Sequence, residues 1–421
     1  MSTAILVYID LQGTVQFVGR LWPHLGKNKQ GASFEYDRSW LENPVRFALE
    51  PALSLNIGSF HTPASKAIFG AIGDSAPDRW GRALMRRAAR RHAKKTGKPH
   101  HTLQEIDYLL LVDDETRQGA LRFSYEQGGP FLAENDTFHI PPMIELQRLL
   151  TAVEHVISES DSDEELRLLL APGSSLGGAR PKASIRDHDG NLAIAKFPHN
   201  NDEIDTVTWE AIALNLAKKA GISVPQTRIE KIADKPVLLL QRFDRGANTR
   251  IPFLSAMSMI GAQDNEVHSY LELVDALRMY GAKPQADIQE LWRRIVFTVL
   301  ISNVDDHMRN HGFLYAGPEG WILSPAYDLN PTPVDISPRI LSNTIDFDDQ
   351  SASLENAFAV SEYFEIPPPQ ARNIASEVGE VVSGWRNEAK QFGLPVTEID
   401  RMATAFEHDD LTTALSKKSG I

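Results

Sequence analysis

Three side chains in the C-terminal half of the chain have the types and the spacing that phosphoryl transfer needs. Asp305 and Asn310 lie five positions apart in one expected loop, and Asp328 follows about two short strands later. Phosphoryl transfer uses one carboxylate to orient an attacking hydroxyl, and an amide oxygen with a second carboxylate to hold Mg²⁺ on the phosphates. The spacing predicts a site that transfers phosphate from ATP, although Asp and Asn also favour turns and helix caps.

The elements around these residues would hold them in place. Residues 291–301 are apolar with a helical period and predict a buried helix that leads to the loop. Residues 311–316 and 321–323 predict two strands joined by a Gly-Pro-Glu-Gly turn, and Asp328 comes after this hairpin. Protein kinases place a base, an amide ligand and a second carboxylate in this order along the chain.

A loop and a lysine upstream are suited to binding phosphate. Residues 172–182 form a small-residue loop that ends in Lys182, and its glycines would let backbone N–H groups approach phosphate oxygens. Lys196 lies within an apolar strand, where a lysine needs a partner or a ligand unless the strand is at a sheet edge in water. Helix 206–220 carries Glu210, which would either pair with Lys196 or lie on the surface.

A buried strand further along the chain predicts a hinge between two lobes. Residues 237–240 are Val-Leu-Leu-Leu, and Gln241 to Arg245 leave this strand. Backbone groups at such a point are available to adenine. The order along the chain is therefore loop, strand lysine, helix, hinge, helical region and the Asp–Asn–Asp set.

In these motifs the sequence resembles the HipA-type serine/threonine kinases, which are toxin components of bacterial toxin–antitoxin pairs. The resemblance is carried by Ser175–Lys182 (SLGGARPK), Ala195–Pro198 (AKFP), Arg242–Arg245 (RFDR), Asn303–Asn310 (NVDDHMRN) and Pro325–Asp328 (PAYD). The N-terminal third adds Gly19–Leu21, Gly73–Arg82 and Gly119–Phe123.

The resemblance implies a role for each matching residue. Asp305 would be the catalytic base, and Asn310 and Asp328 would hold Mg²⁺. The residues expected to bind ATP are Ser175, Leu176, Gly177, Gly178, Ala179, Lys182, Lys196, Gln241, Phe243, His307 and Asn310. In the family a serine of the phosphate loop is itself phosphorylated, which expels the loop and silences the kinase. Ser175 matches that position, and the adjacent Ser174 is the alternative.

Two positions depart from the family pattern. Gln241 stands in the hinge where a glutamate is usual, and backbone contacts to adenine should survive that change. Asp306 stands where glycine is frequent, which leaves its own role open.

The implied fold class is α+β, a protein-kinase-like two-lobed fold with an additional N-terminal α/β subdomain and a mostly helical C-terminal lobe. We expect residues 1–130 to form the N-terminal subdomain. Residues 131–245 would form the nucleotide-binding lobe with the phosphate loop and strand lysine, and residues 246–421 the helical catalytic lobe.

Composition and charge narrow the surroundings in which the chain works. It has no cysteine, and no apolar run reaches the roughly 18 residues of a membrane span, so we expect a cytoplasmic protein. The net charge of −13 argues against DNA binding by the whole surface. Residues 79–98 are strongly basic, however, and would be either a solvated helix face or a contact for operator DNA or an acidic partner.

Three functions stay open at this stage. The first is an ATP- and Mg²⁺-dependent serine/threonine protein kinase that autophosphorylates, acts on a protein substrate, possibly in translation, and pairs with a small helix-turn-helix antitoxin. The second is a small-molecule kinase on a similar fold. The third is a non-enzymatic co-regulator bound to a DNA-binding antitoxin; the presence of Asp305, Asn310, Asp328 and Lys196 speaks against it.

Overall fold

The computed structural model describes residues 3–26, 30–97, 99, 101–133, 140–170, 178–246 and 249–416. The chain forms two compact units. Unit 1 comprises Met1–Asn201 and Glu230–Leu254, and unit 2 comprises Asp202–Ile229 and Ser255–Ile421. The three-part division expected at residues 130 and 245 stays a prediction.

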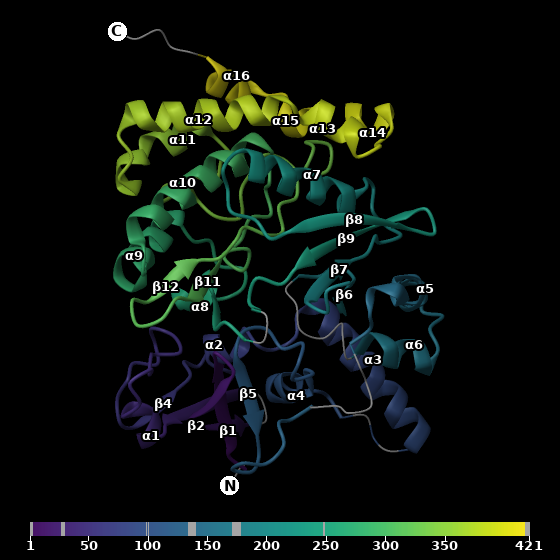
Figure 1. Cartoon of the computed structure of the whole chain (residues 1–421), viewed down its shortest axis with the longest axis vertical. Helices are drawn as coiled ribbons and strands as arrows, with labels where there is room; N and C mark the ends of the chain where they lie inside the picture. Colours follow the sequence, from purple (N-terminus) through teal and green to yellow (C-terminus); the bar gives the residue numbers. More distant parts are fainter. Residues whose placement is uncertain are drawn as a thin grey trace. The chain divides into compact units, whose positions relative to one another are not determined.

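A five-stranded antiparallel sheet forms one part of unit 1 (Figure 1). In the order β4-β3-β2-β1-β5 its strands are Ser59–His61, Gln30–Tyr36, Thr14–Leu25, Ile5–Leu11 and Leu121–Ser124. Gln12 and Gly13 join β1 to β2 with φ angles of 53° and 79°, which suit a two-residue hairpin turn. The short helices α1 (Arg38–Leu41) and α2 (Gly70–Gly73) belong to the same unit.

A second sheet and a group of helices form the other part of unit 1. The sheet has the order β6-β7-β9-β8, with strands Lys182–Arg186, Leu192–Lys196, Lys235–Gln241 and Thr227–Ile232. The helices are α3 (Arg79–Thr96), α4 (Glu105–Leu111), α5 (Leu146–Ile157) and α6 (Asp163–Leu170), with a 3-10 turn at Met143–Glu145. Apolar side chains at helical spacing on α5, such as Leu149 and Val153, share one core with Leu84, Leu169 and Phe197. Figure 1 shows α3, α5 and α6 grouped beside β6.

The turn between β6 and β7 fixes how these two strands pair. Asp187 Oδ1 accepts hydrogen bonds from the N–H groups of Asp189 (2.9 Å) and Asn191 (2.8 Å). Gly190 has a φ of 82°, which glycine adopts without strain. In the resulting register Lys182 is directly opposite Lys196.

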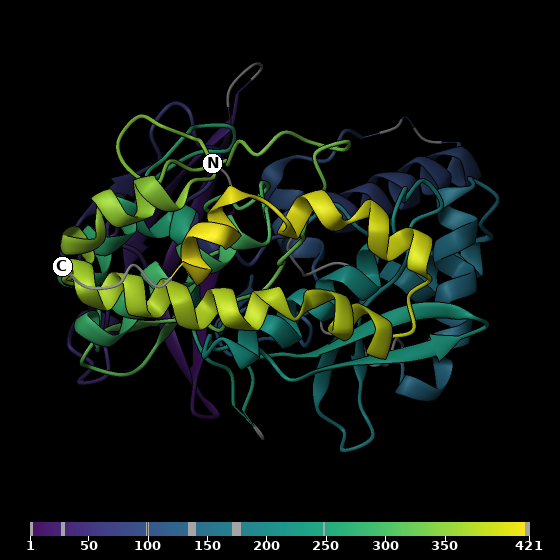
Figure 2. The same ribbon diagram turned by 90° about the horizontal axis from the view of Figure 1, so that it is seen from above.

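Unit 2 is mostly helical. Its helices are α7 (Thr206–Lys219), α8 (Ala256–Met259), α9 (Tyr270–Tyr280), α10 (Pro284–Leu300), α11 (Leu354–Ala359), α12 (Pro368–Ser383), α13 (Trp385–Gln391), α14 (Val396–Arg401), α15 (Ala403–Phe406) and α16 (Asp409–Leu415). A 3-10 turn covers Ser361–Phe364. α10 begins with proline at its first position and packs against α9, α11, α12 and α16. Figures 1 and 2 show α12 lying alongside α16.

Short strands complete the description of unit 2. β11 (Gly312–Tyr315) and β12 (Trp321–Leu323) form an antiparallel hairpin after α10, and β10 (Phe253–Ser255) lies where the chain passes from unit 1 to unit 2. The predicted buried helix at 291–301 and the predicted hairpin are confirmed. In the described part of the chain, no helix is both long enough and apolar enough to cross a bilayer.

Candidate functional site

The loop Asn303–Asn310, called the Asp305 loop below, begins where α10 ends. Ser302 is buried and has a φ of 51°, so the chain leaves the helix through a left-handed residue. Its Oγ donates to the carbonyl oxygen of Ala405 (2.9 Å) and accepts from Arg339 Nε (3.0 Å). Arg339 also forms an ion pair with Asp410 at 2.7 Å. Helices of unit 2 that are distant in sequence therefore fix the start of the loop.

Asp305 and Asn310 are joined by hydrogen bonds within this loop. Asn310 Nδ2 donates to the carbonyl oxygen of Asp305 at 3.0 Å, and the same oxygen accepts from the N–H of His307 at 3.0 Å. Because the side-chain nitrogen of Asn310 donates its hydrogen bond to the backbone, the side-chain oxygen is the atom that can coordinate a cation. Asp305 itself is exposed, as a base that meets a substrate hydroxyl must be.

Asp306, whose role the sequence left open, is a buried structural carboxylate. It is 3% exposed and accepts hydrogen bonds from the Tyr270 hydroxyl (2.5 Å) and His311 Nε2 (3.1 Å). Its carbonyl oxygen accepts from Asn343 Nδ2 at 2.6 Å. Burial alone would raise the pKa of Asp306, but the His311 imidazole and the Tyr270 hydroxyl outweigh it and hold that pKa below its ordinary value. Asp306 thus anchors the Asp305 loop in the core of unit 2.

Asp328 follows the β11–β12 hairpin and has a φ of 59°. Asn330 Nδ2 donates to the carbonyl oxygen (3.2 Å) and to Oδ1 (3.3 Å) of Asp328, and the Asn330 N–H donates to Asn303 Oδ1 at 3.1 Å. The Tyr327 hydroxyl donates to the carbonyl oxygen of Arg309 at 2.8 Å. The segment that carries Asp328 is therefore attached at two points to the Asp305 loop, so unit 2 brings together the three residues on which the sequence argument began.

The donor atoms in these two segments suit a hard cation. Asn310 and Asp328 offer amide and carboxylate oxygens, which Mg²⁺ prefers, and Mg²⁺ commonly takes one or two protein carboxylates together with phosphate oxygens and water. Among the described residues, no group of three or more His, Cys, Asp or Glu side chains is arranged for a metal. Three buried polar atoms of this region have no hydrogen-bond partner within the described part of the chain: Asn303 Nδ2, His307 Nδ1 and Asn330 Oδ1.

In unit 1, Lys196 lies on a central strand. β7 is flanked by β6 and β9, so the alternative of an edge lysine in water is wrong, and Lys196 is half-buried. Lys182 lies directly opposite Lys196, so both side chains leave the same face of the sheet. Like charges at this spacing repel each other unless anions lie nearby. Lys182 has such an anion in Asp78, and the half-buried Lys196 is the lysine of the pair that is proposed to meet phosphate. Glu210, the partner considered for Lys196, is buried in α7 of unit 2, which excludes the surface alternative for it.

Lys182 is paired with an acid inside unit 1. Its Nζ lies 2.9 Å from Asp78 Oδ2, and the residue is 2% exposed. Asp78 is the N-cap of α3 and accepts from the N–H of Gly81 at 2.7 Å. Burial raises the pKa of Asp78, and the charge of Lys182 opposes that rise only in part. Trp80 Nε1 donates to the carbonyl oxygen of Lys182 at 3.0 Å. The end of the predicted phosphate loop is thus joined to the start of α3.

Most of the predicted phosphate loop lies outside the described residues. This applies to Ser174, Ser175, Leu176 and Gly177. Gly178 and Ala179 are described and exposed, and Gly178 has a φ of 103°, which only glycine adopts readily.

The predicted hinge is held by a buried network of charges. Gln241 ends β9, and both Gln241 and Phe243 are half-buried. Arg242 lies between these two residues and Asp244 follows Phe243; both are buried, and they form an ion pair at 2.5 Å. Asp244 also accepts a hydrogen bond from the N–H of Gly119 at 2.8 Å. Burial would raise the pKa of Asp244, but the Arg242 guanidinium outweighs it and keeps that pKa well below its usual range. The hinge segment is therefore tied to the turn that contains Gly119.

Sequence reasoning missed three residues that support the candidate site. Asp78 pairs with Lys182 across more than a hundred positions, and no local pattern shows such a contact. Asn303 and Asn330 join the two segments of unit 2. Asn330 stands two positions after Asp328, and this closeness to a candidate metal ligand was the one sequence feature that could have indicated its role.

The fold is similar to that of a solved toxin–antitoxin protein. The structure of the Shewanella oneidensis MR-1 toxin–antitoxin system HipA, HipB and its operator DNA contains a chain that matches 97% of this chain over 96% of its own length. The TM-score is 0.67 and the sequence identity is 16%. The match confirms the predicted α+β fold class.

Curated relatives match a shorter stretch. A protein named "Putative kinase Y4mE" from Sinorhizobium fredii (strain NBRC 101917 / NGR234) is 26% identical over 194 residues, which cover 39% of this chain and 44% of that protein. A "Putative kinase" from Haemophilus influenzae (strain ATCC 51907 / DSM 11121 / KW20 / Rd) is 23% identical over 197 residues, which cover 41% of this chain and 56% of that protein. The chain thus spans about half the length of these relatives.

A protein-family model matches the part of the chain that contains the motifs of the candidate site. The HipA-like C-terminal domain matches residues 174–385, which is half of the 421 residues. This stretch contains Lys182, Lys196, the hinge, the Asp305 loop and Asp328. The chain therefore belongs to the HipA-like C-terminal domain family.

Proposed function

We propose that this protein is an ATP- and Mg²⁺-dependent serine/threonine protein kinase and the toxin of a bacterial toxin–antitoxin pair. The observation that carries the proposal is the attachment of the Asp328 segment to the Asp305 loop by the Asn330–Asn303 and Tyr327–Arg309 hydrogen bonds. Membership of the HipA-like family and the names of the curated relatives support it.

The chemical step we assign to unit 2 is the transfer of the γ-phosphoryl group to a hydroxyl. The carboxylate of Asp305 accepts the hydroxyl proton while the hydroxyl oxygen forms a bond to phosphorus. The bond between phosphorus and the bridging oxygen breaks, and ADP leaves with that electron pair. Asn310 and Asp328 would hold Mg²⁺, which, when bound, neutralises negative charge on the phosphates.

The groups of unit 1 would hold the nucleotide. Lys196 would contact the phosphates, beside Lys182 on the same face of the sheet. Backbone N–H groups of Ser175–Lys182 would donate hydrogen bonds to phosphate oxygens, and backbone groups of Gln241 and Phe243 would face adenine. In unit 2, His307 would contribute its buried Nδ1, which has no protein partner among the described residues.

The experiment that tests this assignment replaces Asp305 by asparagine. Asp305→Asn should keep the fold and ATP binding but lower the rate of phosphoryl transfer by about a hundredfold or more, because it removes a general base. The measurement is transfer of labelled phosphate from ATP, with ATP affinity and thermal unfolding recorded on the same preparation. Asp335→Asn is the matched control, since Asp335 has an exposed carboxylate that pairs with Arg401. If the Asp305→Asn protein keeps activity within a few-fold of wild type, Asp305 is not the catalytic base.

The same assay separates the proposed substrate class from its alternative. Label on protein supports a protein kinase, whereas label only on a metabolite would support a small-molecule kinase. If ATP binds but no label is transferred to protein or to a metabolite, the remaining alternative is the non-enzymatic co-regulator. The most specific part of the proposal is that the substrate is a protein that takes part in translation.

The proposed partner is a small DNA-binding antitoxin of the helix-turn-helix type. The structurally similar HipA was solved together with HipB and operator DNA, which supports a partner of this kind. Operator DNA would be reached through that partner, or through the basic helix α3. A cytoplasmic location is part of the same proposal.

Self-control by phosphorylation completes the proposal. Phosphate on Ser175 would add roughly two negative charges beside the backbone amides meant for ATP. It would compete with ATP for these amides and repel bound nucleotide, so the loop would leave its ATP-binding position. Ser174 is the alternative acceptor.

A further inference from the structure

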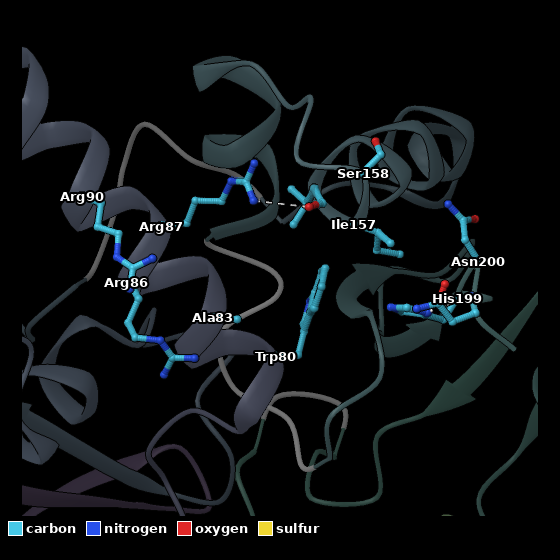
Figure 3. Close-up of a pocket in the computed structure, with 11 residues that line it drawn as sticks. Trp80, Ala83, Arg86, Arg87, Arg90, Ile157, Ser158, His199 and Asn200 are labelled. Carbon is cyan, nitrogen blue, oxygen red and sulfur yellow. Dashed lines mark hydrogen bonds between the residues drawn. The ribbon is translucent and has the colours of Figure 1, made fainter.

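Unit 1 contains a pocket of about 590 Å³ that the proposed function does not use (Figure 3). Its walls come from α3, from the C-terminal end of α5 and from the segment after β7. The lining residues used below are Trp80, Arg86, Arg90, Ser158, His199 and Asn200. The volume is in the range of pockets that take small-molecule ligands, roughly 300–1,000 Å³.

The pocket carries positive charge that the described residues do not neutralise. Its lining includes three arginines and no carboxylate. Arg87 pairs with the fully buried Asp161 and reaches toward α5, where it donates to the carbonyl oxygen of Val156 at 3.4 Å (Figure 3). Arg86 and Arg90 are exposed, and neither forms an ion pair or a side-chain hydrogen bond within the described part of the chain.

The spacing of Arg86 and Arg90 adds to the argument. They lie four positions apart on α3 and so on the same side of the helix, one turn from each other, where two like charges repel and destabilise the helix. In a chain of net charge −13, a concave site with two such cations and no acid is suited to an anion that bridges them.

The other walls of the pocket have a different character. Trp80, 7% exposed, contributes an aromatic edge. Figure 3 shows Arg86, Arg87 and Arg90 on one side of Trp80, and His199, Asn200 and Ser158 on the other. A ligand for such a pocket has an anionic end, an apolar middle and an end that forms hydrogen bonds. A nucleotide fits this arrangement, because its phosphates form the anionic end, the carbon face of its ribose can pack against Trp80, and its base carries hydrogen-bonding groups.

We propose that this pocket is a binding site for a nucleotide, distinct from the site proposed for ATP, with the phosphates on Arg86 and Arg90. The base would lie toward His199 and Asn200. The residues involved are separate from those proposed for catalysis, so the two sites can be tested independently.

The test is isothermal titration of the full chain with inorganic pyrophosphate and with ADP. Pyrophosphate should bind the wild type, and Arg86→Gln/Arg90→Gln should weaken that binding by at least about tenfold, because two charge-assisted hydrogen bonds are lost. ADP should give two binding events. Lys196→Gln should weaken one, and Arg86→Gln/Arg90→Gln the other. The exposure of both arginines means that thermal unfolding of the variant should match wild type, and the single variant Arg90→Gln repeats the test with a smaller change.

The matched control is Arg79→Gln/Lys94→Gln. These two cations lie on the same helix with exposed side chains, and the variant removes the same charge, but neither residue lines the pocket. The inference is overturned if pyrophosphate does not bind, if the control weakens binding as much as the pocket variant, or if only a DNA duplex binds α3. A single ADP event that Arg86→Gln/Arg90→Gln abolishes and Lys196→Gln leaves intact would support the pocket and count against the proposed ATP site.

Discussion

The stability of unit 2 at low pH should depend on the ionisation of one buried carboxylate, that of Asp306. Its pKa in the folded protein lies below the ordinary value, because His311 and Tyr270 favour the charged form more than burial disfavours it. The unfolded chain therefore binds a proton at this residue at a higher pH than the folded chain does. The contribution to stability is complete above the unfolded pKa of about 3.9 and is lost as the pH falls through the lower folded value.

Asp306→Asn should therefore lower stability at neutral pH and flatten its dependence on acid. We expect a loss of about 3 kcal/mol at pH 7, since a neutral amide oxygen is a weaker acceptor for His311 and Tyr270 than the buried carboxylate. The fall in unfolding free energy between pH 5 and pH 3 should be smaller than in wild type. Urea unfolding across this range measures both effects, with Asp335→Asn as an exposed control. A variant that loses stability on acidification as steeply as wild type would show that Asp306 is not the responsible group.

Ser175 offers a second test at the scale of one residue. After incubation with Mg²⁺ and ATP, purified wild-type protein should carry phosphate on Ser175, and this form should bind ATP poorly because of the added negative charge. The Asp305→Asn protein should lack the phosphate. Mass spectrometry locates the modified residue, and Ser174→Ala distinguishes the two neighbouring serines. Phosphate found only elsewhere, or a Ser175 phosphoprotein that binds ATP normally, excludes the self-control part of the proposal.

At the scale of elements, α3 has two basic faces with different environments. Arg87 and Arg91 contact the buried Asp161, and Arg91 lies 3.0 Å from its Oδ2. Lys95 pairs with Asp163 at the start of α6. On the other face, Arg86 and Arg90 remain exposed to solvent. The uniform solvated face considered from the sequence is therefore wrong for the Asp161 side of the helix, where the cations hold α3 against α6.

This division predicts different outcomes for two double variants of α3. Arg87→Gln/Arg91→Gln should destabilise unit 1 by about 3 kcal/mol or more, because it leaves the Asp161 carboxylate buried without a partner. Arg79→Gln/Lys94→Gln, which removes the same charge from exposed positions, should change stability by less than about 0.5 kcal/mol. Thermal or urea unfolding compares them directly. Equal losses in both variants would mean that total charge rather than the Asp161 contact sets the stability.

Elements were predictable from the sequence where a local pattern specified them. The helix before the Asp305 loop, the β11–β12 hairpin, α7 and β9 follow from apolar period and turn residues. Contacts between distant segments were not predictable. Nothing near Lys182 indicates Asp78, and nothing near Asp306 indicates Tyr270, because such pairs exist only once the chain has folded. The candidate residues were thus available from their types and spacing, whereas the side chains that position them were not.

At the scale of the whole molecule, the net charge of −13 sets an expectation for DNA. Phosphate neutralisation needs positive charge, so the chain alone should bind an operator fragment weakly, with a Kd of about 10 μM or higher at physiological salt. With the proposed antitoxin the affinity should rise by several orders of magnitude. A gel-shift series over salt concentration, with and without the partner, measures this. Nanomolar binding by the chain alone would contradict the expectation and shift DNA recognition to this protein.

The β6–β7 turn has a consequence for the chemistry at a distance from it. The side-chain period of a strand is two, so a slip of one residue between β6 and β7 would send Lys182 and Lys196 to opposite faces of the sheet. The Asp187 hydrogen bonds and the left-handed Gly190 prevent that slip. A surface turn with no reactive group of its own therefore keeps Lys196 on the face of the sheet that is proposed to meet the phosphates. Insertions there should be as harmful to the proposed reaction as the loss of Lys196.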